Sequence, residues 1–133
     1  MVLMSTLLSY AESGTPDLKG TWIGDFSILR TAHPKKSGPD PLAYTKPGFH
    51  KVSGVTYVID KQEGTLFSGT EVFGKLSQKI VGVVYDDHKT LYMADQTGLL
   101  FGELIAPDKM RLIYLENGEH GQVAASGIVT RRK

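Results

Sequence analysis

Residues 66–132, LFSGTEVFGKLSQKIVGVVYDDHKTLYMADQTGLLFGELIAPDKMRLIYLENGEHGQVAASGIVTRR, decide the fold, because short apolar runs and turn signals alternate along them almost without interruption. Asn117-Gly118 is the strongest hairpin signal in this stretch, and Pro107-Asp108 is typical of a type I turn. Together with Gly20-Thr21-Trp22 near the start of the chain, the pattern predicts antiparallel strands that follow one another and roll into a small barrel.

We expect eight strands in a single domain over residues 18–132. Their predicted ranges are 18–30, 52–61, 65–73, 80–85, 90–95, 99–106, 110–116 and 122–131. Every connection after residue 61 is short, which favours an all-β, eight-stranded antiparallel up-and-down barrel that closes and leaves no free edge. A two-sheet sandwich is the alternative, but it usually needs longer Greek-key crossovers.

The first strand has an interior face that its alternation identifies. That face carries Leu18, Gly20, Trp22, Gly24, Phe26 and Ile28. The glycines on either side of the only Trp leave room for a bulky ring and allow the strand to coil sharply.

Composition excludes several classes of function. Fifteen Lys and Arg against 14 Asp and Glu argue against a nucleic-acid partner. The absence of cysteine removes disulfides, thiolate zinc sites and cysteine nucleophiles. No run approaches the roughly 18 apolar residues of a membrane helix, so we expect no membrane partner. Residues 1–17 are interpreted as an N-terminal tail or the remnant of an export signal, and the compartment stays open between cytoplasm and periplasm or secretion.

Residues 31–51 interrupt the strand pattern and hold four of the six prolines. Unstructured loops longer than about 12–15 residues are uncommon in compact domains and are often functional lids. Tyr44 and Phe49 give this loop apolar side chains for packing, and His33 and His50 lie near its two ends. We therefore predict a lid across one mouth of the barrel.

Gly20-Thr21-Trp22, the eight predicted strands and Arg131 at the end of the last strand together resemble the calycins, which include lipocalins and avidins. The resemblance implies that Trp22 packs near the closed end of the barrel against Arg131. Arg stacked on indole is a favourable pair, worth about 0.5–2 kcal/mol.

The chain is also similar to small bacterial proteins of unassigned function. The shared features are Gly20 to Gly24, His33-Pro34, Val81-Gly82-Val83 and Tyr92 to Asp95. Biotin binding is rejected, because avidins use several tryptophans and a polar first-strand residue where this chain has Ile23-Gly24. We also expect no C-terminal helix of the kind that lipocalins usually carry after the barrel.

Asp95 and Glu103 are the carboxylate candidates for acid–base catalysis, with Tyr57 as a third candidate group. Inward-facing carboxylates would be buried, with raised pKa values. The alternative is that both lie outside the barrel or at strand ends, and Asp95 before Gln96-Thr97-Gly98 suits a turn cap.

Tyrosines at 57, 85, 92 and 114 lie on four different predicted strands. A tyrosine that faces the interior adds an apolar wall and a hydroxyl that orients a ligand. Tyr57 and Tyr114 are the stronger candidates because their apolar neighbours share their alternation. The predicted ligand-binding set is Tyr57, Tyr114, Phe26, Tyr44, Phe49, His33 and His50.

No pair of the four histidines has metal-ligand spacing, so we expect neither a metal nor a cofactor. Residues 80–85, 99–101 and 112–115 are apolar on both faces. Outward apolar side chains need a cover, which predicts a homodimer or homotetramer.

The leading functional hypothesis is binding of a small, mostly apolar ligand in the barrel mouth under the 31–51 loop. The alternatives are a cofactor-free isomerase, cyclase or lyase that uses an interior Tyr and a carboxylate, and a protein-binding, protease-inhibitor-like module. An interior cavity lined by hydrocarbon favours binding, a carboxylate facing a Tyr inside it favours catalysis, and a filled barrel favours the third hypothesis.

Overall fold

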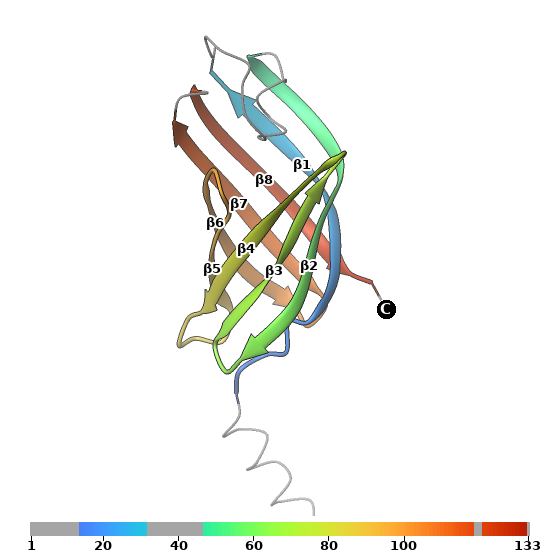
Figure 1. The fold of residues 1–133 in the computed structure, drawn as a ribbon, viewed down its shortest axis with the longest axis vertical. Coiled ribbons are helices and arrows are strands. Elements are labelled where there is room, and N and C mark those ends of the chain that lie inside the picture. The colour runs from blue at the N-terminus through green and yellow to red at the C-terminus, as the bar shows by residue number, and fades with distance from the viewer. Residues whose placement is uncertain (1–13, 32–46, 119–120, 133) are drawn as a thin grey trace, which may run out of the picture.

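The computed structural model describes residues 14–31, 47–118 and 121–132 and shows a closed antiparallel β-barrel (Figure 1). Its strands are β1 (Gly20–Arg30), β2 (Gly48–Glu63), β3 (Leu66–Phe73), β4 (Leu76–Val84), β5 (Thr90–Ala94), β6 (Leu99–Ala106), β7 (Lys109–Gly118) and β8 (Gly121–Arg131). Each strand pairs with its neighbours in sequence, and β8 pairs with β1 to close the cylinder. The predicted eight-stranded up-and-down barrel is therefore confirmed.

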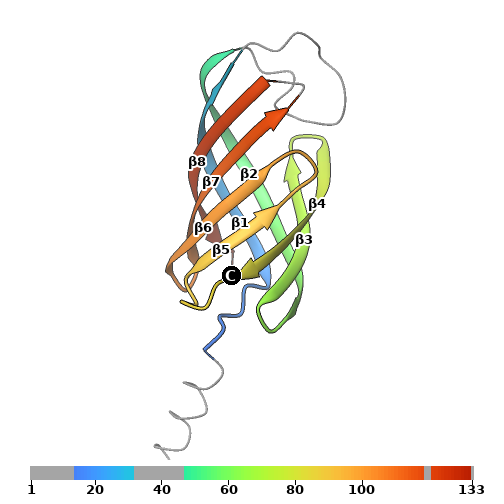
Figure 2. The same cartoon turned by 90° about the vertical axis from the view of Figure 1, so that its left-hand side faces the viewer.

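The wall of the barrel is taller on one side than on the other. Strands β1, β2, β7 and β8 have 11, 16, 10 and 11 residues, whereas β3 to β6 have 8, 9, 5 and 8. Figure 2 shows the four longer strands rising beyond the other four at one end. We call this the mouth end, where β1 finishes and β2 begins, and we call the opposite end, where β1 begins and β8 finishes, the closed end.

Side chains fill most of the interior. Trp22, Phe26 and Ile28 of β1 are buried, as their alternation predicted. On the other strands, including β8, the fully or almost fully buried side chains include Ile59, Ile80, Leu91, Leu100, Met110, Leu112 and Val129. Alternate residues on the same strands face outward, which is the period of two expected for a sheet with one face on a core.

Strand β2 starts earlier than the sequence predicted. Residues 48–51 were assigned to the loop, but they pair with β1 in the register Leu29↔Phe49 and Ile28↔His50. The strand passes Ser53 and Gly54 through a bulge opposite Asp25, whose carboxylate accepts a hydrogen bond from the Gly54 amide at 3.1 Å. Strand β4 likewise begins at Leu76, before the apolar run at residue 80.

Two glycines of β1 are required by close contacts with the end of the chain. A Cβ on Gly20, whose φ is +138°, would lie 2.8 Å from Cδ of Arg131. A Cβ on Gly24 would lie 2.0 Å from the carbonyl oxygen of Ile128, so β1 and β8 approach there more closely than other residues allow. The described residues include no helix long and apolar enough to cross a membrane.

Candidate functional site

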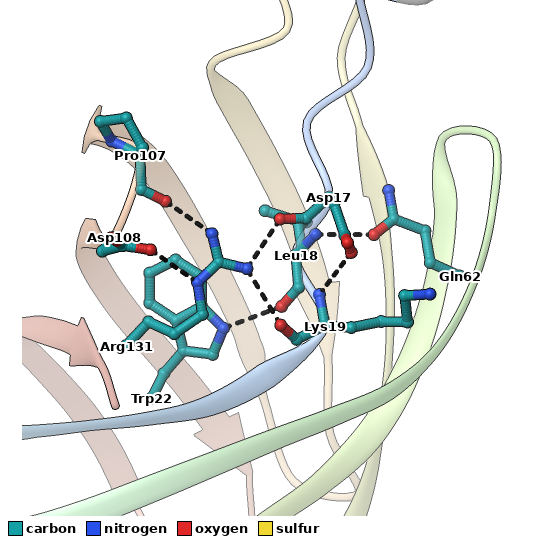
Figure 3. Close-up of polar contacts among 8 residues, drawn as sticks. All are labelled: Asp17, Leu18, Lys19, Trp22, Gln62, Pro107, Asp108 and Arg131. Atoms are coloured by element: carbon teal, nitrogen blue, oxygen red, sulfur yellow. Dashed lines mark hydrogen bonds and ion pairs between the residues drawn. The ribbon is translucent and has the colours of Figure 1, made fainter. Parts of the chain in front are cut away.

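The closed end is sealed by Trp22 and the residues that lead into β1. The Trp22 side chain is completely buried, and its indole Nε1 donates a hydrogen bond to the carbonyl oxygen of Leu18 at 2.9 Å. Leu18 is itself fully buried. The guanidinium carbon of Arg131 lies 4.7 Å from the centre of the indole ring, which is the stacking that the resemblance implied (Figure 3).

Arg131 connects three segments of the chain at this end, namely β8, the β6–β7 turn and the residues that lead into β1. Its Nε donates to Oδ1 of Asp108 at 2.9 Å, and its Nη2 donates to the carbonyl oxygen of Pro107 at 2.9 Å. Its Nη1 donates to the carbonyl oxygens of Asp17 and Lys19 at 2.8 and 2.9 Å. The guanidinium thus joins the β6–β7 turn to the segment before β1, as Figure 3 shows.

Gln62 of β2 forms hydrogen bonds with the segment before β1 from the other side. Its Oε1 accepts from the Leu18 amide at 2.8 Å, and its Nε2 donates to the carbonyl oxygen of Pro16 at 2.8 Å (Figure 3 shows the first of these). Gln62 also donates to the carbonyl oxygen of Gly64 in the β2–β3 turn at 3.0 Å. Because side chains fill the closed end and hydrogen bonds connect its segments, any interior site lies toward the mouth end.

A cavity of about 40 Å³ lies inside the barrel toward the mouth end. Its apolar lining consists of Phe26, Ile28, Val52, Val55, Phe73 and Ala125. Its polar lining consists of Tyr57, Glu71, Gln78, Thr97 and Tyr114. Because one water needs about 10–15 Å³ by this kind of measure, the space holds a few waters or one small chemical group.

The polar lining is organised around the β5–β6 turn. Oδ1 of Asp95 accepts hydrogen bonds from the amides of Thr97 and Gly98 at 2.8 and 2.7 Å, and Oδ2 accepts from Nε2 of Gln78 at 3.2 Å. The Thr97 hydroxyl lies 2.9 Å from the hydroxyl of Tyr114. A continuous polar chain therefore runs from β4 through this turn to β7.

Tyr57 lies deep inside the barrel, with only 4% of its surface exposed. Burial raises the pKa of its phenol well above the ordinary value of 10.0, and the negative charges of Glu71 and Asp95 and the neighbouring Tyr114 raise it further. The hydroxyl of Tyr57 is consequently protonated at any physiological pH. It is suited to donate a hydrogen bond and unsuited to act as a base.

Two charged residues face the interior closer to the mouth. Arg30 and Glu116 are 2% and 7% exposed, and each is the cross-strand partner of Val123, on opposite sides of it. Arg30, Val123 and Glu116 therefore form one inward-facing row over β1, β8 and β7. Cross-strand partners in such a row are close neighbours, so the tall wall carries opposite charges just above the cavity.

The structure brings some of the predicted ligand-binding residues together and separates others. Phe26, Tyr57 and Tyr114 all line the cavity. Phe49 is 84% exposed on the outer side of β2, so its predicted place in the mouth is wrong. His50 is half-buried on β2, but it does not line the cavity. His33 and Tyr44 lie outside the described residues.

Of the two carboxylate candidates, Asp95 alone lies near the cavity. Asp95 is half-buried and caps the β5–β6 turn, as the alternative interpretation expected. Glu103 is exposed on β6, because its neighbours Gly102 and Leu104 take the interior positions, so a role for Glu103 in the interior is wrong. Tyr85 and Tyr92 are 54% and 42% exposed and also lie on the outer wall.

Sequence reasoning missed the interior groups Glu71, Gln78, Thr97, Arg30 and Glu116. A signal for Glu71 was present, because it lies at even spacing between Phe67 and Phe73 on the inward face of β3. Arg30 and Glu116 likewise continue the buried alternation of β1 and β7. Within the described part of the chain, no group of three or more His, Asp or Glu side chains has the arrangement of a metal site.

Comparisons with known proteins support the fold alone. No protein-family model matches this chain, and no curated protein matches it. A solved structure of a redesigned β-barrel is similar, with a TM-score of 0.53 and 8% sequence identity over 87% of this chain and 92% of that chain. At this identity the similarity shows that the two proteins share a β-barrel architecture, and it carries no information on function.

Proposed function

We propose that this protein is a calycin-like binding protein that holds a small, mostly apolar molecule in the interior toward the mouth end. The observation that carries the proposal is the cavity itself. Its lining combines apolar side chains with a few polar groups, and the other end of the barrel is sealed. Apolar walls with a few converging polar groups are typical of small-molecule sites. Biotin is not the proposed ligand, because the interior holds one indole and it lies in the closed end.

The polar lining suggests what the ligand carries. The carboxylate of Glu71 accepts hydrogen bonds, whereas the protonated phenol of Tyr57 donates one. A hydroxyl or amino group on an otherwise apolar molecule fits this pair. A ligand carboxylate in the same position would meet the negative charge of Glu71.

The ligand extends beyond the cavity described above. Small-molecule pockets usually measure about 300–1,000 Å³, and this cavity is about 40 Å³. We propose that the polar group enters the cavity while the apolar body packs on Ile28 and Val52, which line the cavity, and extends from there toward the row of Arg30, Val123 and Glu116. Residues 48–51 of the predicted lid belong to β2, and residues 32–46 lie outside the described residues, so the hypothesis that this loop covers the ligand stays a prediction.

The proposal is tested by filling the cavity from a strand that offers a matched control. Ala125 faces the cavity and Ala124, its neighbour on β8, faces outward. We expect aminoanthracene, an apolar dye with an amino group, to increase its fluorescence with the native protein and with Ala124→Phe, but not with Ala125→Phe. Circular dichroism and thermal melts check that both variants fold. Equal dye binding by the two folded variants would overturn the proposal.

Native mass spectrometry of protein purified from its own host provides an independent test. A small molecule retained by the native protein and lost from Ala125→Phe supports the proposal and supplies the ligand for chemical identification. If Ala125→Phe fails to fold, Glu71→Gln takes its place, and we expect at least a tenfold weaker affinity for an amine-bearing ligand because a charge-assisted hydrogen bond is lost. Unchanged affinity in that variant would contradict the assigned role of Glu71.

A cofactor-free isomerase, cyclase or lyase is the second candidate function. It is favoured by one observation, because the Glu71 carboxylate and the Tyr57 phenol line the same cavity and the charge of Glu71 affects the pKa of Tyr57. In such a reaction Glu71 would move a proton and Tyr57 would donate a hydrogen bond to the developing charge. Recovery of the retained molecule in changed form after incubation with native protein, but not with Glu71→Gln, distinguishes turnover from binding.

A further inference from the structure

The outer wall of the barrel has a continuous apolar face that the proposed function does not use. One cross-strand row joins Val83, Tyr92, Phe101 and Ile113 over β4 to β7. The next row toward the mouth joins Val81, Ala94, Leu99 and Leu115 over the same strands. We call these two rows the outer apolar face.

The side chains of this face are substantially exposed. Its seven larger apolar residues are each between 36% and 60% exposed. If a large apolar residue has about 150–250 Å² of surface, the face exposes on the order of 600 Å². The largest apolar patch on an ordinary monomer measures about 300–600 Å², so this face is at the upper limit for an uncovered surface.

Aromatic rings occupy the middle of the face. The ring of Tyr92 on β5 lies edge-on to the ring of Phe101 on β6, with centroids 6.0 Å apart. On its other side Tyr92 makes the same kind of contact with Tyr85, at 6.2 Å. Aromatic residues surrounded by aliphatic side chains are typical of the centre of a protein–protein interface.

The border of the face toward the closed end is polar and carries both signs of charge. On the side toward the closed end, Glu103 of β6 is the cross-strand partner of Arg111 of β7, and both are exposed. Two copies of a chain with a formal charge of +1 repel each other only weakly. An apolar centre with a rim of mixed charge is complementary to itself, which is what a two-fold symmetric contact requires.

From the size, composition and rim of this surface, we infer that the outer apolar face binds a second copy of this chain, with the β4–β7 walls of two barrels packed face to face. About 600 Å² of apolar surface together with the polar rim reaches the roughly 800 Å² per partner of a standard stable interface. Sheet faces that pack in this way lie about 10 Å apart. The mouth end of each barrel stays outside the inferred contact.

The inference is tested by measuring the mass of the full-length chain in solution at micromolar concentration. We expect analytical ultracentrifugation to give twice the 14.5 kDa of one chain for the native protein. Phe101→Lys places a charge in the centre of the face and should shift the mass to that of the monomer. Because Phe101 points outward, circular dichroism and the melting curve should show an intact barrel.

Phe49→Lys is the matched control. Phe49 is an exposed phenylalanine like Phe101, but it lies on β2, across the barrel from β6. We expect this variant to remain a dimer. If Phe101→Lys fails to fold, Leu99→Lys tests the neighbouring row in the same way. A native protein that is monomeric, or a folded Phe101→Lys variant that remains a dimer, would overturn the inference.

Discussion

The two ends of the barrel are built from the same strands but differ in how completely their interior is packed. At the closed end the polar groups of Trp22 and Arg131 bind backbone carbonyls and one carboxylate, and Leu18 fills the remaining space. Toward the mouth end Tyr57 and Glu71 border a cavity instead. Hydrogen-bonded and filled regions add stability, whereas a cavity lowers it and leaves room for a ligand. The comparison indicates that the closed end maintains the fold and the mouth end is available for function.

Truncation of one buried aromatic side chain of β1 in each region should give the largest effects and separate the two regions. We expect Trp22→Ala to lower the free energy of unfolding by about 4–5 kcal/mol, since the ring is fully buried. Phe26→Ala, four residues along β1 and beside the cavity, should cost about 3 kcal/mol because its packing is already incomplete. Urea unfolding of both variants measures the difference. A larger loss for Phe26→Ala would contradict the assignment of the closed end as the better packed region.

Substitution of Arg131 should have the next largest effect. Arg131→Met removes the ion pair with Asp108, three hydrogen bonds to carbonyl oxygens and the contact with the indole. We expect a loss of about 2 kcal/mol, limited because the water at this end replaces part of the hydrogen bonding. Arg131→Lys should recover less than half of that loss, since an ammonium group lacks the planar fork of donors. Full stability of the lysine variant, measured by the same urea titrations, would show that geometry at this position is unimportant.

Removal of the Tyr57 hydroxyl should change stability mainly at high pH. Near neutral pH we expect Tyr57→Phe to alter the free energy of unfolding by no more than about 1 kcal/mol. Above pH 10 the unfolded chain loses the phenolic proton while the folded protein retains it, because burial and nearby carboxylates raise the pKa in the folded state. The native protein should therefore lose stability more steeply than Tyr57→Phe as pH rises above 10. Parallel alkaline unfolding curves would contradict this environment for the phenol.

The smallest effect is expected at Asp87, in the β4–β5 turn of the closed end. Its carboxylate accepts hydrogen bonds from the hydroxyl and amide of Thr90 and the amide of Lys89, and these lower its pKa from 3.8 to about 2. A carboxyl whose pKa is lowered by folding stabilises the folded state above its ordinary pKa, and this contribution is lost as pH falls from about 4 to 2. Asp87→Asn should therefore be slightly less stable than the native protein at pH 6, and the difference should disappear near pH 2. A difference that is independent of pH in acid melts would contradict this assignment.

The fold was predictable because its signals are local. Trp22, Phe26 and Ile28 alternate with polar residues on β1, and Asn117-Gly118 predicts a hairpin without knowledge of distant residues. Tyr57 and Tyr114 were also predicted to face the interior, since each shares the alternation of its apolar neighbours. Strand β2 was predicted too short because proline-rich residues precede it and a bulge at Gly54 shifts the alternation before Val55.

The site was predicted only in part, because which polar residues meet depends on register. Glu103 and Glu71 are both carboxylates within apolar strands, yet Glu103 faces the solvent and Glu71 lines the cavity. A shift of one residue in a strand exchanges the two faces, so a single carboxylate cannot be placed without the positions of the neighbouring strands. Register also determines the outward position of Phe49. Phe49 pairs with Leu29, whose side chain is exposed on the outer side of β1.

By itself, the sequence determined that this chain forms a closed up-and-down barrel with its indole inside, because period-two alternation and turn residues act over a few neighbouring positions. Only the tertiary structure decided that residues from β2, β3, β4, β7 and the β5–β6 turn converge on one cavity, and that Arg30 and Glu116 flank Val123 above it. The physical reason is that closure and strand register place residues far apart in the chain within contact distance, and no local pattern contains that information.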